Sequence, residues 1–311
     1  MTVDAWVNKT ARDVRNLGLW RGLHRGVQEA CVGAMRRLGY EDRGEYIWER
    51  DWDVLVLLDA CRPDTLSAVC SEYEFVPSDV PTFYSKASSS RIWMEKNFSE
   101  EFAAEMSATR YVCGNPYSGK HLDSRDFGQL DEVWRYGWDE EQGGMPARPI
   151  TDRAVETRRR NPTDRLIVHY MQPHFPSFPD PLGSQLKLET FDDSEEWDSV
   201  WDRLEGGQIS TERVRRSYRE NLRYVLDDVE VLLRSIDADR VVISADHANA
   251  FGEWGQFGHP YNSPIAAIRR VPWVTVSASD SGEYEPTTEY EAPSEETTTD
   301  VDERLSNLGY L

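Results

Sequence analysis

The sequence is poor in cysteine, in lysine and in long apolar runs. Its four cysteines have neither the CxxC spacing of a redox motif nor the spacing of a zinc finger. Because their neighbours are apolar, we interpret them as buried thiols and not as a disulfide framework. Free thiols are typical of a reducing compartment, so the expected location is the cytoplasm.

Nothing in the sequence predicts insertion into a membrane. No stretch approaches the roughly 18 apolar residues that a membrane span needs. The first residues, MTVDAWVNKTARD, lack the basic and then apolar order of a signal peptide. We therefore expect no transmembrane segment.

Positive charge is scarce as well. The chain has 35 basic residues against 56 acidic ones, a net charge of -21, and only five of the bases are lysine. Such a surface repels nucleic acid and anionic membranes, which excludes nucleic acid as a general partner. Abundant acids with arginine in place of lysine are typical of a halophilic protein, because high salt screens a dense negative surface.

One segment reverses this charge. Residues 5–38 carry apolar side chains at helical spacing, and residues 9–37 hold seven basic residues against two acidic ones. Glycines recur every fourth position from Gly18 to Gly26, so one helical face is narrow enough for a close neighbour. We expect either packing against the acidic domain or peripheral contact with a membrane or partner through residues 5–38.

Three apolar runs predict the core strands of a mostly parallel sheet. Residues 53–59, 165–170 and 241–244 are nearly continuously apolar, as in strands covered on both faces. The clearest helical pattern, residues 211–236, leads directly into the third run, which is typical of parallel α/β units. We therefore predict a three-layer α/β/α core in one domain.

Shorter patterns complete the prediction. Residues 110–113 are expected to form another strand, and residues 151–160 a helix capped by Thr151. The alternating aromatic residues within 131–139 favour an edge strand over a substrate platform. The acidic stretch 184–207 is interpreted as a surface insertion or lid.

Three regions follow from these patterns. Residues 1–50 form an N-terminal amphipathic helical segment, and residues 51–277 form the α/β domain. Residues 278–311 form an acidic tail that is partly disordered, because acids, threonine and proline prevail there.

Polar residues at two predicted strand ends indicate a metal site. Asp59 follows the first apolar run, and Asp246 and His247 follow the third. His259 lies twelve residues further on in a glycine-rich loop. Carboxylate and imidazole at the carboxyl edge of a parallel sheet can hold a divalent cation. The alternative is that the aspartate caps a turn and the histidine is solvated.

A serine triplet offers a nucleophile. Ser88, Ser89 and Ser90 precede Arg91 and a helical run, so their hydroxyls and amides lie at a helix N-terminus, which favours an anion. Helix capping alone also explains the serines.

Four motifs occur in a fixed order: LLDACRPD, YSKASSSRIWMEKNF, IVHYMQPHFP and ISADHANAFGEWGQFGHP. Together they resemble the alkaline phosphatase superfamily and are most similar to its sulfatase-like branch of haloarchaeal type. The resemblance covers about residues 52–260 and touches the terminal LSNLGYL. It implies an alkaline-phosphatase-like fold and a metal-dependent enzyme that acts on phosphate or sulfate esters through a covalent intermediate.

The resemblance implies roles for named residues. Ser88 stands at the nucleophile position, with Ser89 its nearest rival, because Trp93 then matches the aromatic residue that follows the nucleophile in transferase members. Formylglycine formation needs proline or alanine two residues after the modified residue and arginine four residues after it. Thr65 and Ser89 stand where that arginine is required, which leaves a plain serine nucleophile.

The remaining expectations concern the metal and the substrate. We expect one firm divalent metal, Zn, Mn, Mg or Ca, and leave a second open. We expect Arg62, Arg91 and His174 to contact substrate. The expected metal ligands and weaker candidates are Asp59, Asp246, His247 and His259, then His174, His169 and Asp180.

Three functions stay open. The first is a phosphoesterase or phosphotransferase acting on a small-molecule or glycan ester, such as a sugar or lipid-linked headgroup. The second is a sulfatase with an unmodified serine. The third is a catalytically silent member that binds a glycan or a partner, because Ala248 and Asn249 replace the Gly and Glu of many relatives. The sequence leaves the oligomeric state open.

Overall fold

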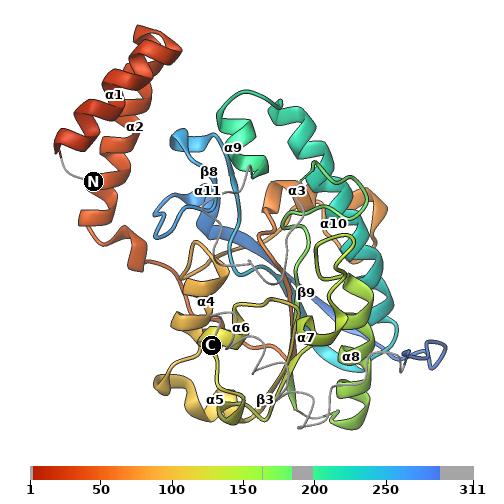
Figure 1. Ribbon diagram of the computed structural model, residues 1–311. Helices are drawn as coiled ribbons and strands as arrows, with labels where there is room; N and C mark the ends of the chain where they lie inside the picture. Colours follow the sequence, from red (N-terminus) through yellow and green to blue (C-terminus); the bar gives the residue numbers. More distant parts are fainter. Residues whose placement is uncertain (1–2, 163, 184–198, 288–311) are drawn as a thin grey trace.

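The structure is a computed structural model that describes residues 3–162, 164–183 and 199–287. Its centre is a seven-stranded sheet in the order β2-β9-β6-β1-β5-β3-β4, with helices on both faces (Figure 1). A two-stranded ribbon, β7 with β8, lies beside it. The strands are β1 Val54–Leu58, β2 Thr82–Tyr84, β3 Thr109–Cys113, β4 Gln129–Glu132, β5 Arg165–Tyr170, β6 Ala238–Ser244, β7 Ala250–Phe251, β8 Phe257–Gly258 and β9 Arg270–Ala278.

The five strands from β6 to β4 run parallel, and β9 and β2 complete one edge in antiparallel pairing. Val56 at the centre of β1 pairs with Val168 of β5 and Ile243 of β6. All three side chains are fully buried. Continuous apolar runs form these strands because helices cover both faces of the sheet.

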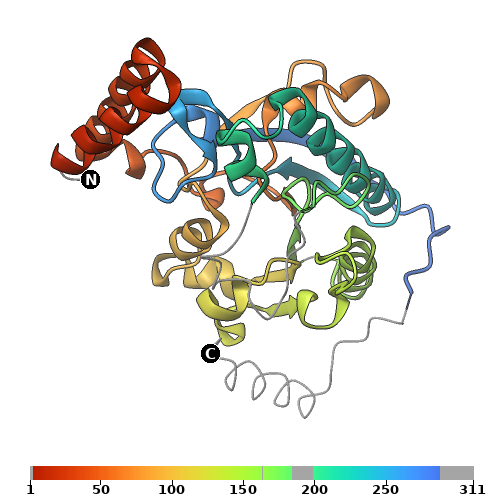
Figure 2. The same cartoon turned by 45° about the horizontal axis from the view of Figure 1, so that its top comes forward.

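Helices α7, α8 and α10 cover one face, and α4, α5 and α6 lie on the other (Figures 1 and 2). The longest, α10, starts after Ser210, whose side chain accepts a hydrogen bond from the Arg213 amide, and buries an apolar stripe against the sheet. The helices of these layers are α3 Pro63–Ser67, α4 Ser90–Asn97, α5 Ala103–Ser107, α6 Ser118–His121, α7 Trp134–Gly137, α8 Ala147–Arg160, α9 Val200–Glu205, α10 Thr211–Leu233 and α11 Ala266–Arg269.

The predicted fold class is confirmed, since the core is an α/β/α sandwich around a mostly parallel sheet. The three apolar runs are β1, β5 and β6, and residues 110–113 belong to β3. The helix predicted over residues 211–236 is α10, which ends at Leu233.

Two local predictions are wrong. The alternating aromatic residues do not form an edge strand, because β4 ends at Glu132 and Trp134–Gly137 form the short helix α7. The buried Trp134 indole donates to Ser118 Oγ at 2.9 Å, and this tertiary contact stabilises the helical turn of α7. Thr151 does not cap α8, which begins at Ala147; its hydroxyl donates instead to the Ala147 carbonyl one turn earlier.

The N-terminal segment is a helical hairpin of α1, Val3–Leu17, and α2, Leu19–Arg37. Gly18 separates them with a φ of 86°, which favours glycine. A Cβ added at Gly26 would lie 2.7 Å from the Thr10 side chain, so the glycine spacing does serve close helix packing. The hairpin projects from the body (Figures 1 and 2).

The first part of the predicted acidic tail packs on α8. Arg159 pairs with Asp280 at 2.8 Å, and the Tyr284 hydroxyl donates to the Asp152 carboxylate. The rest of the tail, residues 288–311, and residues 184–198 of the predicted insertion lie outside the described residues. Among the described residues, no helix is long and apolar enough to cross a membrane.

The buried Arg269 side chain joins the segment that follows α2 to the body and supplies a test of the fold. It donates to the carbonyls of Tyr40, Arg43 and Ser85 and is 1% exposed. Arg269→Met keeps much of the volume but leaves these acceptors unpaired, so we expect unfolding free energy to fall by about 3 kcal/mol in denaturant titrations.

Arg234→Met provides the control, because that side chain is 72% exposed and pairs only with Glu230 at the end of α10. We expect a change within about 0.5 kcal/mol there. Equal stabilities for the two variants would contradict the structural role of Arg269.

Candidate metal centre

Three predicted ligands converge where β1 and β6 end. Asp59 follows β1, and Asp246 and His247 follow β6; the two strands pair in parallel with Leu57 beside Ser244. One ligand atom from each of the three residues lies within 4.8 Å of the others. His247 Nε2 is 3.5 Å from Asp59 Oδ1 and 3.6 Å from Asp246 Oδ2. The parallel register therefore builds the cluster from residues far apart in sequence.

The two carboxylates are buried beside each other. Burial and the charge of Asp246 raise the pKa of Asp59 well above its usual value. Burial also opposes ionisation of Asp246, but the imidazoles of His247 and His169 hold the pKa of Asp246 below its usual range. A positive charge beside them would therefore stabilise the two adjacent carboxylates.

Three buried atoms in the cluster lack a hydrogen-bond partner among the described residues: Asp59 Oδ1, Asp246 Oδ2 and His169 Nε2. Leaving such groups unpaired is costly. His169 Nε2 is 3.8 Å from Asp59 Oδ2 and 3.9 Å from Asp246 Oδ2. Carboxylate and imidazole donors suit a divalent transition metal, so the residues present fit the implied cation.

His169, a weaker candidate in the sequence, lies beside the two carboxylates of the site. It lies in β5, between β1 and β3, with its side chain fully buried. Its Nδ1 is 2.8 Å from the Tyr111 hydroxyl, which fixes the ring orientation. Burial lowers the pKa of His169 to about 4, so the ring is neutral at pH 7. A fourth potential ligand thus faces the two carboxylates.

Ser90 supplies the hydroxyl at this cluster. Its Oγ donates to Asp59 Oδ2 at 3.1 Å and lies 3.5 Å from His247 Nε2. Ser90 is the first residue of α4, so its hydroxyl sits at a helix N-terminus.

The structure does not bring Ser88 to the cluster. Its Oγ donates to the Pro260 carbonyl at 3.2 Å and accepts from the Ser263 amide at 3.1 Å. Ser89 is the N-cap residue of α4, and its buried Oγ has no partner among the described residues. Of the three serines, Ser90 and not Ser88 therefore has its hydroxyl at the cluster.

Asn115 is a site residue that sequence reasoning missed. Its Nδ2 donates to Asp59 Oδ2 at 2.7 Å, and its side chain is almost fully buried. It follows β3, from which only Gly114 separates it. A polar residue at the carboxyl end of another parallel strand was the signal that could have found it.

His174 and His259 lie next to the metal cluster. Their Nε2 atoms are 3.0 Å apart, and the His259 and His247 ring centres are 4.5 Å apart. Burial and the nearby His247 lower the pKa of His174 to about 4 and the pKa of His259 well below its usual value. Both rings remain partly exposed, so they face the accessible side of the site.

The two arginines are paired with acids. Arg62 forms ion pairs with Asp64 at 2.8 Å and Glu253 at 3.0 Å, and donates to the Asn249 carbonyl. Arg91 pairs with Glu95 at 3.0 Å on a largely exposed surface.

The weak candidate Asp180 forms two hydrogen bonds with Arg213, which gives it a structural partner away from the cluster. None of these contacts joins Arg62, Arg91 or Asp180 to Asp59, Asp246 or His247, and the substrate contacts of the two arginines stay predictions.

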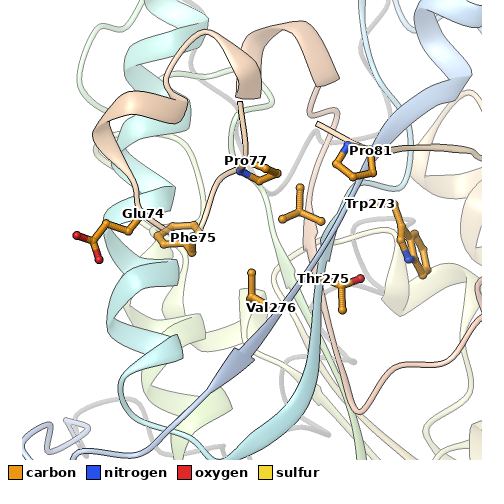
Figure 3. Close-up of a pocket in the computed structure, with 8 residues that line it drawn as sticks. Glu74, Phe75, Pro77, Pro81, Trp273, Thr275 and Val276 are labelled. Atoms are coloured by element: carbon orange, nitrogen blue, oxygen red, sulfur yellow. The ribbon is translucent and has the colours of Figure 1, made fainter. Parts of the chain in front are cut away.

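A separate cleft lies at the edge of the sheet (Figure 3). It has a volume of about 490 Å³ and is lined by Glu74, Phe75, Pro77, Pro81 and residues 273–276 of β9. None of the predicted site residues lines it. The cleft therefore has no part in the metal chemistry.

The sequence matches no protein-family model and no curated protein. Among solved structures, the integral membrane protein lipooligosaccharide phosphoethanolamine transferase A from Neisseria meningitidis is similar, with a TM-score of 0.51 at 13% identity. The match covers 88% of this chain and 59% of that one, so this chain spans well under two thirds of that length.

Two further structures are similar with lower scores. The C-terminal periplasmic domain of EcEptC from Escherichia coli, in complex with Zn, has a TM-score of 0.47 at 10% identity, covering 76% of this chain and 75% of that one. A protein assigned as a sulfatase from Bacteroides thetaiotaomicron has a TM-score of 0.41 at 13% identity, covering 72% and 64%. At 13% identity, the likeness to the transferase shows the fold alone, and activity has to be argued from the site.

Metal content tests the cluster directly. We expect the purified protein to bind about one Zn²⁺ or Mn²⁺ per chain and to melt about 5 °C higher or more with excess metal, because the ion binds only the folded state. Asp246→Asn preserves the shape of the side chain but removes its charge, so we expect it to lose both effects.

Asp180→Asn is the matched control, since that carboxylate pairs with Arg213 instead. It should keep the metal and the shift in melting temperature. Elemental analysis and thermal melts that show equal metal binding by the two variants would rule out the cluster as the site.

Proposed function

We propose that this protein transfers or hydrolyses a phosphate ester of a sugar or lipid-linked headgroup, with Ser90 as the nucleophile at a divalent metal centre. The observation that carries the proposal is the contact of Ser90 Oγ with Asp59 Oδ2 at 3.1 Å. It joins a hydroxyl, a buried carboxylate and a helix N-terminus at one point. This combination suits in-line displacement at phosphorus.

Asp59, Asp246 and His247 would hold the cation, with His169 as a fourth potential ligand. When bound, the cation lowers the pKa of a hydroxyl beside it and stabilises negative charge on the ester oxygens. The Ser90 hydroxyl already donates toward Asp59, so its proton has an acceptor. The oxygen–phosphorus bond to Ser90 then forms as the bond to the leaving oxygen breaks.

The rest of the site stabilises the charge that develops. Ser90 opens α4, and the free amides of a helix N-terminus favour negative charge beside them. The proposed role of His174 and His259 is to bind the leaving or nonbridging oxygens, because both are partly exposed beside the cluster. Water or an acceptor hydroxyl then receives the phosphoryl group from Ser90.

The choice of phosphate over sulfate rests on the nucleophile. Ser90 is followed by Ile92 and Met94, where formylglycine formation requires proline or alanine and then arginine. An unmodified serine suits phosphoryl transfer better than sulfate hydrolysis. The second candidate function is a sulfatase that uses an unmodified serine. Faster cleavage of sulfate esters than of phosphate esters would distinguish it from the first.

Replacement of single serines tests the proposal. Ser90→Ala should lower the turnover of phosphate esters by about 10³-fold or more, because it removes the nucleophile. It should also abolish any phosphoserine detected by mass spectrometry after quenching. Ser88→Ala removes only contacts to residues 260 and 263, so we expect turnover to stay within about tenfold of the unmodified protein.

Three results would change the assignment. Full activity of Ser90→Ala would exclude it as the nucleophile, and faster cleavage of sulfate than phosphate esters would favour the sulfatase. Metal binding without turnover of either ester class would favour a silent binding protein.

A further inference from the structure

Helix α2 presents an uncovered apolar stripe to solvent. The residues of this stripe recur at intervals of three and four positions, so they share one side of the helix. Trp20 is 82% exposed, Leu38 73%, Val27 59% and Leu23 45%. The α2 stripe consists of Trp20, Leu23, Val27, Cys31, Ala34 and Leu38, all of them exposed.

The opposite side of α2 is already packed. Gly22 and Gly26 are buried, and the Trp6 indole of α1 donates to the Gly26 carbonyl at 2.8 Å. Val32 is buried in a small apolar cluster with Ala250, Ile265 and Ile268 of the body. No residue within 3–162, 164–183 or 199–287 therefore buries the stripe, and the hairpin stands out from the body (Figure 2).

Charge indicates what covers the stripe. Residues 9–37 contain seven basic residues against two acidic ones, whereas the whole chain has a net charge of -21. Arg12, Arg15 and Arg37 are exposed on the hairpin. A basic, apolar helix on an otherwise acidic protein is complementary to a negatively charged lipid surface.

We propose that the α2 stripe docks the protein on an anionic lipid bilayer. Trp20 would lie at the interface, as tryptophan favours, with Leu23 and Val27 in the acyl boundary. The same lipid surface repels the acidic body. The body would therefore stay on the water side of the hairpin, and the protein would have one orientation on the bilayer. A second copy of the chain is a poorer occupant, because pairing two stripes brings two basic hairpins and two acidic bodies together.

The hairpin also contacts the loop that carries His259. Arg36 of α2 donates to the carbonyls of Tyr261 and Asn262 at 3.1 and 3.0 Å. Ser88, just before α4, contacts Pro260 in the same loop. The hairpin that docks is therefore joined directly to a loop of the candidate metal centre. The docking itself does not depend on the proposed chemistry.

Vesicle flotation of the full chain tests the docking. We expect the protein to float with vesicles of equal parts phosphatidylcholine and phosphatidylglycerol, and much less with phosphatidylcholine alone. The double variant Trp20→Ser with Val27→Ser should weaken binding by about tenfold or more. It removes two apolar side chains whose transfer from water to the bilayer would stabilise the bound state. Arg12→Glu with Arg15→Glu should remove the preference for the anionic vesicles.

Glu212→Gln, an exposed substitution at the start of α10, is the control and should float like the unmodified protein. Metal content and circular dichroism should be unchanged in every variant, since none lies in the cluster. Ser90→Ala should also float normally, which separates this proposal from the enzymatic one.

Two outcomes would overturn the docking. The first is an unmodified protein that stays off anionic vesicles. The second is a Trp20 and Val27 variant that binds them equally well. A dimer in light scattering that this variant loses, without vesicle binding, would assign the stripe to a second copy.

Discussion

The structure depends on two carboxylates, Asp59 and Asp246, that are buried side by side at the ends of neighbouring strands. Their repulsion, in a place that water does not reach, has to be offset by everything around them. Ser90 and Asn115 donate to Asp59, and the Ala60 amide donates to Asp246 at 3.1 Å. Two imidazoles face the remaining oxygens. The residues of the cluster therefore fit a bound cation, whose charge would offset that of the two carboxylates.

Much of this arrangement could be predicted from the sequence, because its signals are strong and local. Continuous apolar runs identify buried parallel strands, and an acid directly after such a run identifies the ligand edge. Which of the three serines lies at the cluster could not be predicted. Ser90 opens α4, Ser89 is its extended N-cap residue and Ser88 lies before the helix, so the three differ in environment although their letters are identical.

Other residues depend on contacts that the sequence does not display. Asn115 reaches Asp59 because β3 lies next to β5 and β5 next to β1, an order that no local pattern specifies. The short helix α7 replaces an expected strand because the Trp134 indole finds Ser118, sixteen residues earlier. In each case tertiary contacts override the local preference.

The pairing of β1 with β6 has a consequence for how the chain folds. Ala60 and Asp246, which share a hydrogen bond, are 186 residues apart in sequence, so closing this contact costs more chain entropy than any local turn. During synthesis the first carboxylate emerges long before its partner, and the site cannot exist until most of the chain has left the ribosome. The cluster would then assemble only after β6 has been synthesised, as a late event in folding.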